Sequence, residues 1–269
     1  MILWIIYYIL LFKKILSKKY NKYQNPYYYL LITVSITGII NYTLTYFHTI
    51  IPLTPGINKL YIPYKPSNKY GLLNFFYLYT TFAYYVSLIM LLLNIFQAFD
   101  EKTTILSRNI YFEIFGMLII PIPMLFYTIT SEAQLQYIPN GDTIKSNYMI
   151  LKITTKNNLT NSLDNILKIC YYLYISYSII FMIIIIKRFI KNGNKKNHLK
   201  KIKLTFLLIL LQYPNITVKI IRHIYKIEDY LKTKYLVPFL FLSFILSTIF
   251  TIVIIIIIDK NSRKLFYYK

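Results

Sequence analysis

Long apolar runs separated by short polar stretches dominate the sequence. A helix needs about 20 apolar residues to cross a bilayer core of about 30 Å. Six segments reach or approach that length, and each is bracketed by polar or charged residues: 27–51, 72–99, 110–129, 166–186, 204–224 and 236–258. The pattern therefore predicts an all-α, multi-pass transmembrane helix bundle rather than a soluble globular domain.

A shorter apolar run opens the sequence. Residues 2–12 are wholly apolar, but Lys13 and Lys14 interrupt them after about half the length that a span requires. If both lysines extend towards lipid headgroups, residues 1–16 form a thin first span; otherwise the segment lies in the interface or a preceding part is missing. A cleaved signal peptide is disfavoured, because the basic start and the small-residue cleavage site are lacking. We expect seven helices with a short first helix, in a single domain over residues 1–269.

Composition supports a lipid environment. Hydrophobic residues make up 57% of the chain and charged residues 15%, well below the roughly 25% of soluble domains. The net charge of +22 would suggest nucleic acid in a soluble protein, but the basic residues form short clusters between apolar runs. We therefore expect no nucleic-acid partner. Enrichment in Ile, Tyr, Lys and Asn is typical of an A/T-rich genome, so single members of the 30 Tyr are given no specific role.

The distribution of Lys and Arg predicts the orientation, because short cytoplasmic loops retain basic residues. The larger share of the 31 falls in 13–22, 102–108, 187–203 and 260–269. The five basic residues of the last outer loop run against the rule, although Glu228 and Asp229 partly offset them. We expect an outer amino terminus and a cytoplasmic carboxyl terminus, in the plasma membrane.

The basic segment between the fifth and sixth predicted helices is expected to face a protein partner or anionic lipid. Its predicted partner-contact residues are Lys187, Arg188, Lys191, Lys195, Lys196, Lys200 and Lys201. On the opposite side, Asn158, Leu159 and Thr160 form an N-glycosylation sequon in the longest outer loop, 130–165. Sequons also occur at Asn41 and Asn215 inside predicted helices, where they are chance matches.

Candidate catalytic chemistry is sparse. Cys170 is the single cysteine, so an intrachain disulfide and a multi-cysteine metal site are excluded. The histidines His48, His198 and His223 fall in different segments and form no i, i+4 pair. No nucleotide-binding glycine motif is present. We therefore predict no catalytic, metal or cofactor-binding residue, no cofactor, and no enzymatic activity.

Prolines inside predicted spans are more informative. Pro121 and Pro123 lie in the fourth span and Pro214 in the sixth, where each removes a backbone hydrogen bond and favours a kink. Kinked helices suit a protein that binds a ligand on one side and shifts helices on the other.

Local sequence resembles the nematode serpentine receptors of class gamma, a G-protein-coupled-receptor-like family. The stretch NPYYYLLITVSITGIINYTLTYF at 25–47 is similar to that family's second helix, and SLIMLLLNIFQAF at 87–99 to the end of its third. HLKKIKLTFLLILLQYP at 198–214 and DKNSRKLF at 259–266 are similar to its sixth-helix start and its tail. The resemblance implies a chemoreceptor for a small molecule in sensory neurons, with a pocket between the outer halves of helices three, five, six and seven.

One departure bears on the signalling partner. The family usually places an arginine after the asparagine at the inner end of the third helix, and here Ile95 follows Asn94. This difference argues against ordinary coupling to a G protein. Three alternatives stay open beside the receptor: a small transporter or channel, a membrane-embedded lipid enzyme, and a decayed receptor copy.

Overall fold

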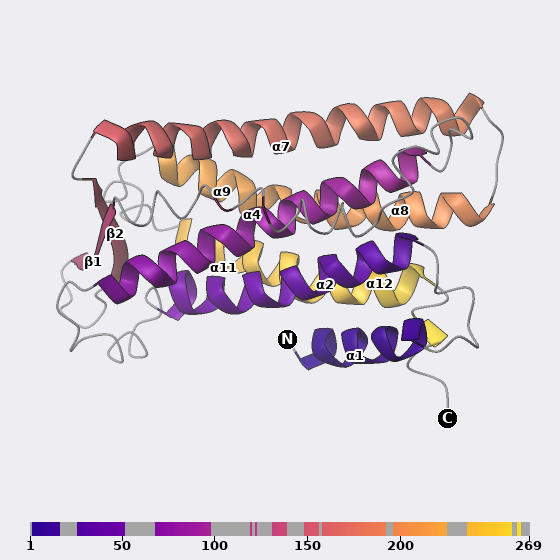
Figure 1. Ribbon diagram of the computed structural model, residues 1–269, viewed down its shortest axis with the longest axis horizontal. Coiled ribbons are helices and arrows are strands. Elements are labelled where there is room, and N and C mark those ends of the chain that lie inside the picture. Colours follow the sequence, from indigo (N-terminus) through magenta and orange to yellow (C-terminus); the bar gives the residue numbers. More distant parts are fainter. Residues whose placement is uncertain are drawn as a thin grey trace.

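The computed structural model describes residues 2–16, 26–51, 68–97, 119, 122, 131–138, 148–155, 158–191, 196–224, 236–259 and 263–264. Most of them form long helices that lie side by side along one axis (Figure 1). The elements, in chain order, are α1 (Ile2–Leu16), α2 (Pro26–Thr45), η2 (Tyr46–Ile50), α4 (Asn68–Gln97), β1 (Ser131–Ile138), β2 (Tyr148–Thr155), α7 (Asn158–Lys191), α8 (Lys196–Leu210), α9 (Tyr213–Ile224), α11 (Leu236–Ile245), η5 (Leu246–Phe250) and α12 (Thr251–Ile258).

The described helices run in both directions along this axis. In Figure 1, α1, α4, α7 and α12 end on the right, where α2 and α8 begin, and the strands β1 and β2 lie on the left. We call the right-hand side the basic end and the left-hand side the strand end. Helix α4 ends at the basic end, and the next element of the described chain, β1, lies at the strand end.

Four helical segments are long and apolar enough to cross a membrane: Pro26–His48, Phe75–Phe96, Lys168–Lys191 and Phe241–Ile258. They match four of the predicted spans, which confirms a multi-pass helical membrane protein. Three other predicted spans are not shown. Helix α1 has only 15 residues, the span at 204–224 is divided between α8 and α9, and the span at 110–129 lies outside the described residues apart from Ile119 and Ile122.

Two antiparallel strands complete the described part of the chain. Strands β1 and β2 pair from Ser131 opposite Thr155 to Ile138 opposite Tyr148. The sequence of β2, YMILKITT, is rich in aromatic and β-branched residues that favour strands. The prediction of an all-α fold did not include this pair, because the segment was taken as an outer loop.

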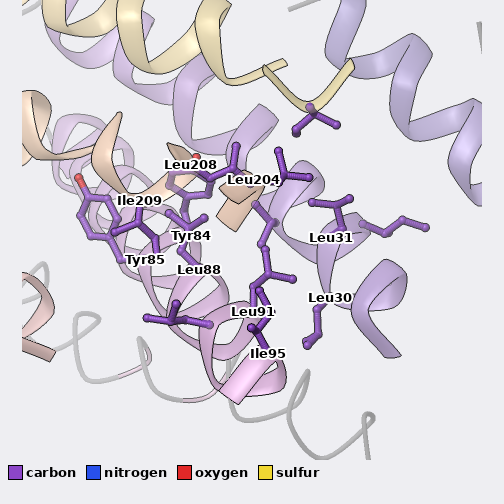
Figure 2. Packing of buried hydrophobic residues seen from close by; sticks show 14 of the residues in the cluster. Leu30, Leu31, Tyr84, Tyr85, Leu88, Leu91, Ile95, Leu204, Leu208 and Ile209 are labelled. Atoms are coloured by element: carbon purple, nitrogen blue, oxygen red, sulfur yellow. The ribbon is translucent and has the colours of Figure 1, made fainter. Parts of the chain in front are cut away.

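Helices α2 and α4 form the centre of the bundle. In an 18-residue apolar stretch of the Phe75–Phe96 segment 67% of the residues are buried, against 28% in the corresponding stretch of Lys168–Lys191. Apolar side chains from α2, α4 and α8 meet in one cluster (Figure 2). Its labelled members include Leu30 and Leu31 of α2, Leu88, Leu91 and Ile95 of α4, and Leu204, Leu208 and Ile209 of α8.

Helix α7 shows how the outer helices meet lipid. Its buried residues recur at the three- and four-residue spacing of one helical face: Tyr171, Tyr174, Ser178, Met182 and Ile185. The opposite face exposes large apolar side chains, among them Tyr177, Ile180 and Ile190. In water this face would be an apolar patch of unusual size, whereas in a bilayer it contacts acyl chains.

Several threonine hydroxyls inside the helices bond to the preceding turn. Thr37 donates to the carbonyl of Thr33 at 2.8 Å and Thr45 to that of Asn41 at 2.8 Å. Such bonds to the preceding turn let a threonine lie in an apolar helix without an unpaired hydroxyl.

The last described span contains a π-helical turn, η5, between α11 and α12. Its inward-facing polar residues lie four positions apart: Ser243, Ser247 and Thr251 are all buried. The π turn carries one residue more than an α turn, so this strict spacing of four stays on a single face.

Candidate functional site

Polar side chains from several helices meet around the hydroxyl of Tyr42, in the interior of the bundle. This hydroxyl lies 2.9 Å from that of Tyr84 on α4 and accepts a hydrogen bond from Gln212 Nε2 at 3.1 Å. Thr251 on α12 is a further hydrogen-bonding partner of Tyr42. All four side chains are buried.

Asn41, the residue before Tyr42 on α2, extends this group. Thr81 Oγ1 on α4 donates to Asn41 Oδ1 at 2.8 Å, and both side chains are fully buried. We refer to these residues as the polar layer: Asn41, Tyr42, Thr81, Tyr84, Gln212 and Thr251. The layer links α2, α4, α12 and the junction between α8 and α9.

Two amide atoms of the polar layer have no hydrogen-bonding partner among the described residues. They are the donor Nδ2 of Asn41 and the acceptor Oε1 of Gln212. A buried polar group left unpaired costs about 1–3 kcal/mol, so such groups are rare unless they serve a function. The polar layer therefore holds one donor and one acceptor with capacity for a further polar group.

A glycine allows α2 and α4 to approach at this point. A Cβ atom on Gly38 would lie 3.1 Å from Tyr84 Cε2 and 3.7 Å from Tyr42 Cε2. The first distance is shorter than ordinary van der Waals contact. Gly38 thus gives the Tyr84 ring the space to place its hydroxyl against Tyr42.

Aromatic side chains flank the polar layer on the side of α7. The ring centroids of Tyr85 and Tyr174 are 4.8 Å apart, and Tyr85 also meets Tyr171 edge to face at 6.3 Å. Ser178 on α7 shares a 2.8 Å hydrogen bond with the hydroxyl of Tyr213 on α9. Phenol rings and hydroxyls therefore continue from the layer towards two further helices.

The chemistry available in this region is hydrogen bonding without charge. Each side chain of the polar layer is an amide, a phenol or a hydroxyl, and none is charged at neutral pH. Within the described part of the chain no group of three or more His, Cys, Asp or Glu is placed to hold a metal ion. His48 is buried and stacks on Tyr77, with ring centroids 4.2 Å apart. The layer is suited to hydrogen bonding with a further polar group.

The junction of α8 and α9 brings Gln212 into the core. Helix α8 ends at Leu210 and α9 begins at Tyr213, with Leu211 and Gln212 in a turn between them. Pro214 is the second residue of α9. Proline has no N–H to donate, and in a continuous helix its ring would clash with the carbonyl four residues earlier. Across the junction, the Gln212 N–H donates to the carbonyl of Ile209 at 3.0 Å.

The two halves divided by this junction pack on different neighbours: α8 on α4 and α12, and α9 on α7 and α11. The other two prolines for which a kink was predicted, Pro121 and Pro123, lie outside the described residues.

The predicted partner-contact residues separate into two groups at the basic end. Lys187, Lys191 and Lys200 are exposed. Arg188 and Lys201 are only partly exposed and lie over aromatic rings: the Arg188 guanidinium carbon is 4.0 Å from the centroid of Phe96, and Lys201 Nζ is 4.8 Å from that of Tyr27. Lys195 lies outside the described residues, and the side chain of Lys196, on α8, is not described.

Asp259 supplies a carboxylate beside Lys201. The hydroxyl of Tyr28 donates to Asp259 Oδ1 at 3.4 Å. Burial lowers the pKa of Lys201, and the charge of Asp259 opposes that change. Arg263 donates to the carbonyls of Ile256 and Ile257 and so caps the end of α12.

The remaining predicted positions are not brought together with the polar layer. Asn158 is the first residue of α7, and its glycosylation stays a prediction. Ile95 is 3% exposed, so the position at which the resembled family has arginine is part of the apolar core here.

Sequence reasoning missed the polar layer because single tyrosines were given no role. The signal that was present is the pair of amides, Asn41 and Gln212, inside predicted spans, where polar residues are costly and rare. Comparison with known proteins adds no assignment: no family model matches the chain, and no curated protein matches it.

Proposed function

We propose that this chain is a seven-helix transmembrane receptor, similar in plan to the serpentine receptors of class gamma, that responds to a small chemical stimulus. The observation that carries the proposal is the polar layer. It joins helices far apart in the sequence around Tyr42, and it retains a donor on Asn41 and an acceptor on Gln212 without partners among the described residues. A ligand that pairs with these atoms would change the contacts of several helices at once.

The directions of the described helices support this plan. Helices α1, α4, α7 and α12 run towards the basic end, and α2, α8 and α9 run away from it. The chain passes from the basic end after α4 to the strand end before β1, as the predicted span at 110–129 requires. These directions support the proposed seven crossings, with the two termini on opposite sides.

The signalling partner differs from a standard G protein in this proposal. Ile95 is buried in the leucine-rich core and offers no charge at the inner end of α4 (Figure 2). The exposed cations at the end of α7 and in the first half of α8 offer a surface for contact on that side.

Topology mapping in cells tests the proposal. Tags at both termini and in the segment between β1 and β2 are probed with and without permeabilisation, and a mobility shift removed by glycosidase reports a glycan at Asn158. The Asn158→Gln variant is the matched control. An outer amino terminus, an inner carboxyl terminus and a glycan at Asn158 are expected, whereas an amino terminus on the inner side would refute the receptor plan.

A transporter is the second candidate, and the junction between α8 and α9 favours it. Transporters bind substrates where helices are interrupted near the middle of the membrane, and Gln212 occupies such an interruption. Pro214 is a sufficient cause of the interruption, which is why the receptor is preferred. Solute uptake by vesicles containing the purified chain, lost in Gln212→Leu, would favour the transporter instead.

A further inference from the structure

Lysines from separate parts of the sequence gather at the basic end of the bundle. Lys13 lies near the end of α1, Lys187 and Lys191 at the end of α7, Lys200 and Lys203 in α8, and Lys264 after α12 (Figure 1). All six side chains are exposed. We call these six lysines the headgroup surface.

Three other cations described at this end are engaged within the protein. Arg188 lies over the ring of Phe96, Lys201 over the ring of Tyr27, and Arg263 on the last carbonyls of α12. These three cations contact groups within the bundle itself. The headgroup surface is therefore a distinct set whose charges face outwards.

Acidic residues do not neutralise the headgroup surface within the described part of this end. The carboxylate described there is that of Asp259, which accepts the Tyr28 hydroxyl and lies within electrostatic range of Lys201. Among the described residues, then, no carboxylate neutralises the six lysines.

The neighbours of these lysines identify the kind of partner. Lys187 and Lys191 continue the exposed apolar face of α7, directly beside Ile186 and Ile190, which are 46% and 75% exposed. Lys13 follows the exposed Phe12 in the same way, and Lys203 lies one turn from the exposed Leu207. Cations at the rim of a lipid-facing apolar surface lie at the depth of lipid headgroups.

We propose that the headgroup surface binds anionic phospholipid, with the lysine ammonium groups contacting headgroup phosphates and carboxylates. An acidic protein would instead need cations gathered on one face beyond the membrane, whereas these surround the bundle where its outer helices leave the bilayer. Each lysine near an anionic membrane surface contributes roughly fivefold to binding. The proposal does not depend on the receptor function.

The test compares lipid binding by purified protein in nanodiscs. Wild type and a variant with Lys187→Gln, Lys191→Gln, Lys200→Gln and Lys203→Gln are placed in phosphatidylcholine, with or without phosphatidylserine. Phosphatidylserine retained on the protein is then measured by mass spectrometry. The Lys168→Gln variant, changed at the strand end, is the matched control.

We expect wild type and Lys168→Gln to retain phosphatidylserine and to gain thermal stability from it. The fourfold variant, in which four lysines are replaced, should retain at least about tenfold less phosphatidylserine than wild type. Its melting temperature in phosphatidylcholine alone should equal that of wild type, which shows that it folds. Equal retention by the fourfold variant and wild type would overturn the proposal.

Two further measurements separate other sources of the anion. Stabilisation of wild type by inorganic phosphate in pure phosphatidylcholine, equal to that by phosphatidylserine, would show a phosphate-ion site and overturn the lipid assignment. A Lys201→Gln variant should keep its phosphatidylserine retention. Loss of that retention would contradict the division between engaged and outward-facing cations.

Discussion

Replacing Tyr42 with phenylalanine tests whether the polar layer holds the bundle together. The change removes a single oxygen and keeps the ring contacts with Tyr84 and Phe244, whose centroids lie 5.5 Å and 6.4 Å away. It deletes the acceptor for Gln212 Nε2 and the partner of the Tyr84 hydroxyl. Both groups remain buried, so neither can regain its hydrogen bond from solvent.

The size of the effect follows from those losses. Hydrogen bonds between membrane helices contribute about 0.6 kcal/mol on average, and a buried polar group left unpaired costs about 1–3 kcal/mol. We therefore expect Tyr42→Phe to lower the free energy of unfolding by about 2 kcal/mol, or the melting temperature by roughly 4–8 °C. Tyr177→Phe, on the lipid-facing side of α7 where the ring is 53% exposed, should change it by less than about 0.5 kcal/mol.

A double-mutant cycle isolates the bond to Gln212. Thermal unfolding in detergent micelles is measured for wild type, Tyr42→Phe, Gln212→Leu and the double variant. Gln212→Leu removes the donor that Tyr42→Phe would leave without an acceptor. Tyr42→Phe should therefore cost about 1 kcal/mol less in the Gln212→Leu variant than in wild type. Equal costs in both backgrounds, or a Tyr42→Phe effect no larger than that of Tyr177→Phe, would refute the assigned role.

Three further changes address other contacts. Gly38→Val should destabilise the bundle by about 1–3 kcal/mol, because the added atoms meet the Tyr84 ring. Gly38→Ala should cost less, because alanine recovers about 1 kcal/mol of helix propensity. Thermal unfolding of the two variants measures the difference. Burial lowers the pKa of Lys201, so the unfolded chain binds more protons than the folded one between that pKa and 10.5. Stability should therefore rise with pH through this window, and Lys201→Met should abolish that rise, as measured by melting temperature against pH. Arg263→Leu should speed amide hydrogen exchange in the last turn of α12 and leave α2 unchanged, because the guanidinium no longer holds the carbonyls of Ile256 and Ile257.

The helices at the centre of the bundle could be predicted from the sequence. A bilayer requires long apolar helices, and the segments that contain Leu31 and Leu88 satisfy that requirement on length alone. The division of the sixth predicted span could be predicted only in part. Pro214 signals an interruption, but its effect falls on Leu211 and Gln212, which precede it.

The polar layer could not be predicted from the same pattern. Tyr42 and Tyr84 occupy positions where any aromatic residue would continue an apolar run, and the pairing of their hydroxyls depends on how α2 and α4 pack. Gly38 permits that packing, yet a single glycine in a span does not indicate which helix approaches it. The strands were missed for a related reason: the register that pairs Ser131 with Thr155 depends on contacts between segments that are separate in sequence.

The π turn η5 has a consequence for comparing this chain with its relatives. Ser247 lies inside η5, between buried Ser243 and buried Thr251. Deleting one residue from Leu246–Phe250 would convert the turn to α-helix and leave both flanking inner faces in place. Homologues can therefore differ in length by one residue within this membrane helix. An alignment that confines its gaps to loops would then shift one half of the helix by about 100° and pair core residues with lipid-facing ones.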